Sequence, residues 1–166
     1  MNEIKSKIKF EKKMIILIGN IGSGKTTYCK KLVNQGYIIV SKDALRYMLG
    51  NGNYIFDRRL EASVHLSEKD ILCNFVKLGV NVVVDDCNVY SRLRKHAIAI
   101  GKSQDYQITA YILPKLSQKA CVDRRMKNSH GNSSRATWNK VWDMFNHNTE
   151  EPSYKEEFDK IIYLRK

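Results

Sequence analysis

One short stretch near the N-terminus decides the fold of this chain, Met14-Ile15-Ile16-Leu17-Ile18 followed by Gly19-Asn20-Ile21-Gly22-Ser23-Gly24-Lys25-Thr26. A short apolar run that ends at a glycine is typical of a strand buried on both faces. The next eight residues fit the pattern G-x-x-x-x-G-K-[ST], and helical character follows over residues 25–34. A strand, a glycine-rich loop and a helix in this order predict a phosphate-binding loop.

The residue types of this loop suit the binding of a nucleoside triphosphate with Mg²⁺. Glycines let the backbone turn tightly, so that successive N–H groups point at phosphate oxygens, and the positive end of the helix adds to the field. We expect Lys25 to reach the β- and γ-phosphates and the Thr26 hydroxyl to ligate Mg²⁺. A glycine-rich turn with an incidental lysine is the alternative, which the flanking strand and helix disfavour. The expected nucleotide-binding residues are Gly19, Asn20, Ile21, Gly22, Ser23, Gly24, Lys25, Thr26 and Thr27.

Strands alternate with helices along the rest of the chain, which predicts an α/β fold with a parallel sheet covered on both sides. Only two prolines occur, and no linker or repeat is visible, so we expect a single domain over residues 1–166. Ligands of such sheets bind beyond the carboxyl ends of the strands. The expected strands are residues 14–18, 37–40, 80–84, 107–113 and 158–164, and the expected helices, capping serines included, are residues 25–34, 41–49, 57–78, 91–102, 117–127 and 135–146.

The composition of the 166 residues fits a globular protein, with 43% hydrophobic and 28% charged residues. It excludes a disordered or collagen-like chain, and no apolar run approaches the roughly 18–20 residues of a membrane span. Residues 1–13 are charged and lack the cleavage site of a signal peptide, so the expected location is the cytoplasm. Scattered cysteines without clustered histidines predict reduced thiols rather than a zinc site at Cys29, Cys73, Cys87 and Cys121.

The charge balance is strongly basic. Lys and Arg number 29 against 17 Asp and Glu, which gives a formal net charge of +12. Such an excess indicates a polyanionic partner, although it also serves solubility. Charge alone does not distinguish a long nucleic acid from a small nucleotide.

Asp43 and Arg46 follow the second expected strand, at the sheet edge where the phosphate loop lies. They are three residues apart, so on a helix they share a face. A carboxylate at this edge can take the proton from an attacking hydroxyl, and an arginine one turn away can hold an acceptor phosphate. An ordinary salt bridge at the start of a helix is the alternative.

Asp85 and Asp86 follow the third expected strand. A carboxylate at the end of an apolar strand beside a phosphate loop often holds Mg²⁺ or its waters. Adjacent residues of a continuing strand point to opposite faces, so only one of these acids faces the site. The sequence leaves open which one does, and the other would cap a turn or a helix.

Arg124 and Arg125 end an expected helix just before a polar loop, and we expect a helical lid at about residues 124–135. Phosphoryl transfer needs positive charge over the γ-phosphate, which a lid arginine can supply while the lid excludes water. Arginines that merely complement the dipole of their own helix are the alternative. His130 is interpreted as a polar residue of the loop.

An aromatic stripe follows the lid, at Trp138, Trp142 and Phe145. Its helical spacing predicts a core-facing stripe rather than a platform for nucleic-acid bases.

These motifs, in this order, resemble the P-loop polynucleotide 5′-hydroxyl kinases, especially the bacteriophage kinase domain, over residues 14–164. The most specific parts are the phosphate loop, the D-x-x-R of Asp43 and Arg46, and V-V-D-D-C-N at residues 83–88. The resemblance implies that Asp43 is the general base and that Arg46 contacts the acceptor phosphate. It also implies a substrate site at Asp86 and Asn88, and a lid arginine that matches Arg124 or Arg125. Cys87 stands where the family has Thr, so a hydroxyl contact is lost there.

The resemblance implies a three-layer P-loop kinase sandwich that transfers the γ-phosphate of ATP, or of GTP, with Mg²⁺ onto the 5′-OH of DNA or RNA. The same motifs occur more loosely in zeta-toxin-like and small-metabolite kinases, so a nucleoside, a nucleotide or another metabolite is an alternative acceptor. A nucleotide-switched module that only binds nucleic acid is a third possibility. No fused phosphatase or ligase module is expected, and neither the oligomeric state nor the pathway follows from the sequence.

Overall fold

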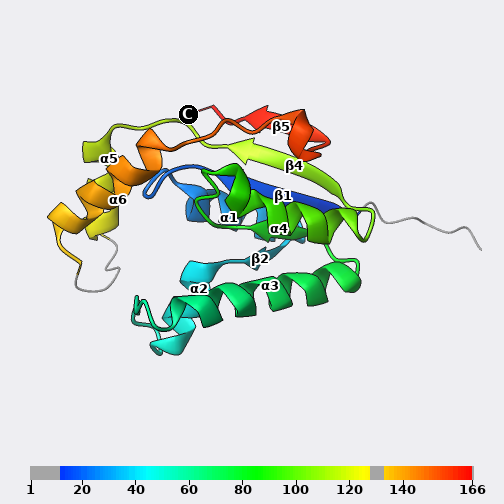
Figure 1. Cartoon of the computed structure of the whole chain (residues 1–166), viewed down its shortest axis with the longest axis horizontal. Coiled ribbons are helices and arrows are strands. Elements are labelled where there is room, and N and C mark those ends of the chain that lie inside the picture. Colours follow the sequence, from blue (N-terminus) through cyan, green and yellow to red (C-terminus); the bar gives the residue numbers. More distant parts are fainter. Residues whose placement is uncertain (1–11, 128–132, 166) are drawn as a thin grey trace, which may run out of the picture.

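A computed structural model describes residues 12–127 and 133–165 of the chain. The core is a five-stranded parallel sheet in the order β2-β3-β1-β4-β5 (Figure 1). The strands are β1 (Lys13–Ile18), β2 (Ile38–Val40), β3 (Val82–Val84), β4 (Gln107–Ile112) and β5 (Lys160–Tyr163). The helices are α1 (Lys25–Val33), α2 (Lys42–Leu49), α3 (Glu61–Lys77), α4 (Ser91–Lys102), α5 (Gln118–Lys127) and α6 (Arg135–His147), with a 3₁₀ turn at Tyr154–Glu156.

The two faces of β1 carry different parts of the core because alternate side chains point to opposite faces. Met14, Ile16 and Ile18 pack against α3 and α4, whereas Ile15 and Leu17 pack against α1. The sheet is therefore buried on both faces, and the predicted three-layer α/β sandwich is confirmed. In the described part of the chain, no helix has both the length and the apolar character that crossing a membrane requires.

The long helix α3 begins later than the sequence pattern predicts, at Glu61 rather than at residue 57. Residues 57–60 form a turn instead, in which the backbone N–H of Arg59 donates to the Asp57 carboxylate at 2.9 Å. A short acidic side chain that bonds to the backbone two residues on competes with a helix and favours a turn. The consequence is a longer loop between α2 and α3, which carries several residues of the site described below.

The strand boundaries also differ from the prediction, by one or two residues. The strand expected at 80–84 pairs only over Val82–Val84, and the one expected at 158–164 pairs over Lys160–Tyr163. Phe158 is instead buried in the core, and the Asp159 carboxylate accepts the backbone N–H of Ile108 at 2.6 Å, so side chains dock this segment before the strand begins. The middle of the expected lid and His130 lie outside the described residues.

Candidate active site

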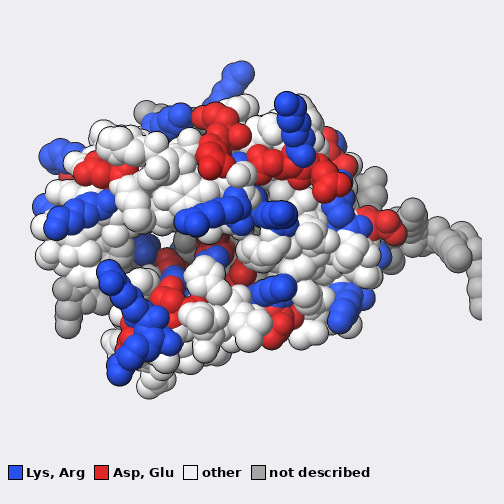
Figure 2. All heavy atoms as spheres, in the orientation of Figure 1, with Lys and Arg blue, Asp and Glu red and all other residues white. Residues whose placement is uncertain are grey.

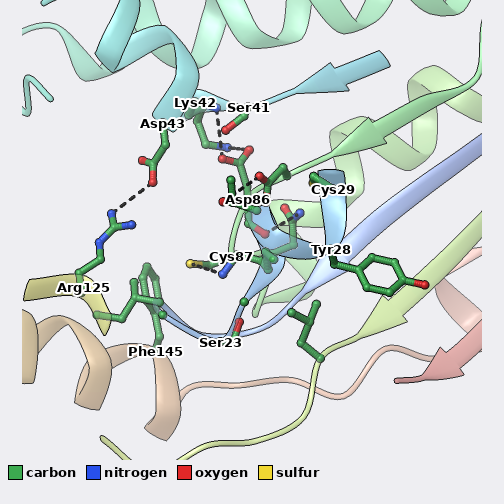
Figure 3. A pocket seen from close by; sticks show the side chains of 18 of the residues that line it. Ser23, Tyr28, Cys29, Ser41, Lys42, Asp43, Asp86, Cys87, Arg125 and Phe145 are labelled. Carbon is green, nitrogen blue, oxygen red and sulfur yellow. Dashed lines mark hydrogen bonds and ion pairs between the residues drawn. The ribbon is translucent and has the colours of Figure 1, made fainter. Parts of the chain in front are cut away.

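A cavity of about 1630 Å³ lies at the carboxyl ends of the central strands. Figure 2 shows the hollow on one face of the molecule, and Figure 3 shows the side chains within it. The phosphate loop forms one side, the start of α2 forms another, and α5 and α6 close a third. This is the edge of a parallel sheet at which ligands of such folds bind.

The phosphate loop has the backbone that its glycines predict. Gly22 and Gly24 adopt positive φ angles of 63° and 106°, which L-residues with side chains rarely adopt. A Cβ atom at Gly22 would also lie 2.2 Å from the Cys121 carbonyl oxygen, because the loop presses against α5. Any larger residue at Gly22 would therefore displace the loop from the helix.

Lys25 folds back over the loop that precedes it. Its ammonium donates to the carbonyl oxygens of Gly19 and Asn20, both at 2.8 Å, and lies 3.5 Å from the Cys87 sulfur. The Cys87 thiol, at the position where the resembled family has Thr, thus still contacts the lysine, and its burial raises its pKa. These contacts hold the ammonium within the loop, where phosphates bind in proteins with this motif.

The structure separates the two adjacent acids after β3. Asp85 accepts a hydrogen bond from the Thr26 hydroxyl at 3.2 Å, so it lies beside the phosphate loop. Asp86 turns to α2 instead, where its carboxylate lies 2.7 Å from the Lys42 ammonium and accepts the Lys42 backbone N–H at 3.3 Å. Burial raises the pKa of both carboxyls, that of Asp86 to about 6. Asp86 thus holds the start of the helix that carries Asp43.

Asn88 shapes the loop after β3. Its side-chain amide donates to the Leu17 carbonyl at 2.9 Å, and its backbone adopts a φ of 49°. The buried Arg94 donates to the Asn88 carbonyl at 2.9 Å and forms an ion pair with Glu156. These contacts explain a structural need for Asn88, while its contact with an acceptor stays a prediction.

Asp43 is the centre of a second cluster across the cavity. Its carboxylate accepts hydrogen bonds from Arg46 at 2.7 Å, Tyr54 at 3.0 Å and Arg125 at 3.2 Å. Burial opposes ionisation of Asp43, but the charges of Arg125 and Arg46 outweigh it, so its pKa lies below the ordinary value. The structure thus brings together two residues of one helix with a third that lies more than 70 positions away in the sequence.

Glu61 is a member of this cluster that sequence reasoning did not identify. Its two carboxylate oxygens accept from the Arg46 guanidinium at 2.9 and 2.6 Å, a bidentate pair. Tyr54, which bonds to Asp43, was missed as well. Both residues lie in or just after the α2–α3 loop, where no local spacing links them to Asp43, so only their charge and polarity could have drawn attention to them.

The two lid arginines point to different parts of the site. Arg124 donates to the Gly22 carbonyl at 3.2 Å and therefore lies over the phosphate loop. Arg125 pairs with Asp43, and its guanidinium lies 4.6 Å from the centre of the Trp138 ring. Figure 3 shows Arg125 reaching across the cavity to the carboxylate.

The aromatic stripe of α6 lies in a small core, as predicted. Trp138 packs with Ile21 of the phosphate loop and with Val122 of α5, and Trp142 and Phe145 border this cluster. Helix α6 thus packs against the phosphate loop through Trp138, and the ring of the same residue lies beneath Arg125.

The residues present fit a nucleotide with Mg²⁺. The N-terminus of α1, the Lys25 ammonium and two left-handed glycines provide the positive cradle that phosphates require. The buried Ser23 hydroxyl has no hydrogen-bond partner among the described residues, as expected of a group that faces a ligand. Thr26 and Asp85 supply adjacent oxygen atoms, which is the donor type that Mg²⁺ prefers.

Comparison with known proteins gives the class to which this fold and site belong. The sequence profile of the family described as "AAA domain" matches residues 14–152, which is most of the chain. The chain belongs to this family, whose phosphate loop implies binding of an ATP-type nucleotide.

Individual proteins that are similar to the chain include several kinases. The chain is 28% identical, over 138 residues, to a protein of Autographa californica nuclear polyhedrosis virus named "Putative bifunctional polynucleotide kinase/RNA ligase"; the match covers 74% of the chain but only 19% of that relative. A chain of the Pnkp1/Rnl/Hen1 RNA repair complex has 19% identity and a TM-score of 0.67, over 93% of this chain and 49% of that one. Shikimate kinase from Acinetobacter baumannii has 16% identity and a TM-score of 0.61, with coverages of 95% and 87%.

These matches confirm the predicted resemblance to polynucleotide kinases, and the chain has a P-loop kinase fold. The chain spans about a fifth of the viral relative and about half of the repair-complex chain, so the activity of those whole proteins does not transfer directly.

Proposed function

We propose that this protein is a phosphotransferase that moves the γ-phosphate of ATP, or of GTP, onto the 5′-OH of DNA or RNA. The observation that carries the proposal is the position of Asp43, whose carboxylate lines the same cavity as the phosphate loop and is held by two arginines. A loop that only switches with a bound nucleotide has no need of a carboxylate aimed at an acceptor.

On the donor side, the loop amides and Lys25 hold the triphosphate and offset the charge on the transferring phosphoryl group. Thr26 and Asp85 are the residues that would hold Mg²⁺, which would neutralise part of the charge of the triphosphate. Arg124 adds positive charge over the loop, in keeping with its contact to Gly22.

On the acceptor side, Asp43 accepts the hydrogen bond of the attacking hydroxyl and orients it toward the γ-phosphorus. As the new O–P bond forms, the bond between the γ-phosphorus and its bridging oxygen breaks, the nucleoside diphosphate leaves and the hydroxyl proton passes to Asp43. Because the pKa of Asp43 is low, its main contribution is to position the nucleophile, and the proton is then released to solvent. Arg46 and Arg125 hold the carboxylate and lie where an acceptor phosphate would approach.

The direct test combines the purified protein, γ-labelled ATP and Mg²⁺ with 5′-OH oligonucleotides of DNA and RNA, nucleosides, nucleotides and small hydroxyl metabolites. We expect label on the 5′ end of the oligonucleotides, with an acceptor KM that rises steeply with salt because a polymer releases counterions when it binds. Label on small acceptors alone, with a KM insensitive to salt, would support a metabolite kinase, which the likeness to shikimate kinase makes the leading competitor. Binding of ATP and oligonucleotide without transfer would support a nucleotide-switched binding module.

A further inference from the structure

Tyr54 contacts the Asp43 carboxylate, but the proposed reaction so far gives it no task. It lies in the loop between α2 and α3, and its hydroxyl donates to Oδ1 of Asp43 at 3.0 Å. Burial, and then the charge of Asp43, raise the pKa of Tyr54, so the hydroxyl keeps its proton at neutral pH. The hydrogen bond therefore has a fixed direction, from the tyrosine to the carboxylate.

The three donors around Asp43 divide its two carboxylate oxygens unequally. Arg46 donates to Oδ1 at 2.7 Å, as Tyr54 also does, whereas Arg125 donates to Oδ2 at 3.2 Å. An ionised carboxylate has about four accepting positions, two on each oxygen. Within the described part of the chain, the contacts of Asp43 thus fill Oδ1 and leave one accepting position at Oδ2.

Oδ2 faces α5, the helix that also contacts the phosphate loop. Its partner Arg125 comes from α5, and the preceding residue, Arg124, donates to the Gly22 carbonyl of the loop at 3.2 Å. In Figure 3, the Asp43 side chain extends from α2 toward Arg125. A hydroxyl that bonds to Oδ2 therefore lies between α2 and the helix that borders the phosphate loop.

The surroundings of Tyr54 hold its hydroxyl at this position. Its ring lies edge-on against the ring of Tyr47, with 5.3 Å between the ring centres, and the backbone N–H of Gly52 donates to the Tyr47 carbonyl at 2.8 Å. The guanidinium carbons of Arg46 and Arg125 lie 5.9 and 5.7 Å from the centre of the Tyr54 ring, within the range of a cation–π contact. The ring is thus fixed by α2 and by the same two arginines that bind Asp43.

We propose that Tyr54 is a positioning residue: together with Arg46 it occupies Oδ1 of Asp43, so that Oδ2 is the atom that accepts the hydroxyl of the acceptor. This inference rests on the proposed function. The hydroxyl proton passes to Oδ2 as the new O–P bond forms and the nucleoside diphosphate leaves, and Tyr54 keeps its own proton. Without the tyrosine hydroxyl the carboxylate can turn about its Cβ–Cγ bond, so Oδ2 is aligned less often and the rate falls.

Tyr54→Phe tests the proposal, because it removes the hydroxyl and keeps the ring against both arginines. With γ-labelled ATP, Mg²⁺ and a 5′-OH DNA pentanucleotide, we expect kcat to fall about tenfold while both KM values stay nearly unchanged, since alignment is lost rather than binding. Tyr163→Phe is the matched control and should leave kcat unchanged. The Tyr163 hydroxyl also donates to a carboxylate, that of Glu151 at 3.4 Å, but Tyr163 lies outside the cavity.

A double substitution separates this role from a general loosening of the loop. In an Asp43→Ala background, Tyr54→Phe should cause no further fall in the single-turnover rate, because the hydroxyl acts through a carboxylate that is no longer there. A further tenfold fall in that background, or equal kcat for Tyr54→Phe and Tyr163→Phe, would overturn this inference alone. Absence of transfer by the parent protein would overturn the proposed function and this inference with it.

Discussion

The proposed donor side and the proposed acceptor side of this cavity are built in different ways. The donor side is a continuous run of residues, 19–26, whose backbone forms the cradle and whose lysine bonds to the carbonyls of its own loop. The acceptor side is assembled from α2, the α2–α3 loop, the start of α3 and the end of α5, and side-chain ion pairs hold it together. Local backbone chemistry defines the first, and long-range charge pairing defines the second.

The two sides should respond differently to substitutions. A loop built from backbone groups tolerates changes of most neighbouring side chains but not of its lysine or its glycines. A cluster built from paired charges depends on every partner, because removing one leaves another buried charge unpaired. Changes on the two sides should therefore separate nucleotide binding from acceptor chemistry.

The largest effect is expected from Lys25→Ala. Loss of the ammonium removes the main side-chain charge from the cradle, so kcat should fall by at least about 10³-fold and nucleotide affinity should also weaken. Single-turnover transfer and nucleotide titration measure the two effects, with Lys69→Ala as an exposed control on α3. Transfer within tenfold of the parent protein would show that the loop does not hold the donor phosphates.

Asp43→Asn should reduce phosphate transfer nearly as much as Lys25→Ala does, but it should leave nucleotide binding nearly unchanged. We expect kcat to fall by roughly 10²–10³-fold, because the amide cannot accept the hydroxyl proton, while ATP binding stays nearly intact. Raising the pH should not restore activity, because the amide does not ionise, whereas the low pKa of Asp43 keeps the parent carboxylate ionised at neutral pH. Full turnover by Asp43→Asn, with Asp70→Asn as the surface control, would refute the assignment of the base.

Gly22→Ala tests whether the donor cradle depends on backbone shape. Gly22 and Gly36 both have positive φ, but only at Gly22 would a Cβ meet backbone, the Cys121 carbonyl, whereas nothing lies within 4 Å at Gly36. Gly36→Ala should therefore cost about 1–2 kcal/mol of unfolding free energy and leave nucleotide binding unchanged. Gly22→Ala should cost more and should weaken nucleotide binding. Denaturant unfolding and nucleotide titration of both variants measure this, and equal losses would contradict the role of the α5 contact.

Glu61→Gln should give the smallest effect and should appear only on the acceptor side. It removes the charge of a bidentate partner of Arg46, so we expect kcat/KM for the acceptor to fall about tenfold while the KM for ATP stays unchanged. Asp57→Asn is the matched control, because it alters an exposed pair with an arginine, Arg59, in the loop just before α3. If Glu61→Gln changed the two KM values equally, the separation between the two sides would not hold.

Much of the fold and the backbone of the phosphate loop could be predicted from the sequence. The apolar runs and the glycines between them predict the α/β sandwich, because a strand buried on both faces needs consecutive apolar residues and a tight turn favours glycine. They do not predict the start of α3. The Asp57 side chain bonds to the backbone N–H of Arg59 and so favours a turn over the first helical turn, which a helical pattern in the sequence does not reveal. Only the structure shows that Asp85 contacts Thr26 and that Asp86 contacts Lys42. Strand alternation places the two acids on opposite faces but does not identify their partners.

The sequence by itself determined the phosphate cradle of this protein, because the cradle is made from the backbone of consecutive residues and local spacing fixes its shape. Only the tertiary structure decided the arrangement of the proposed acceptor side. Asp43, Glu61 and Arg125 meet because three separate elements fold against one another, and buried charges find their partners across space rather than along the chain.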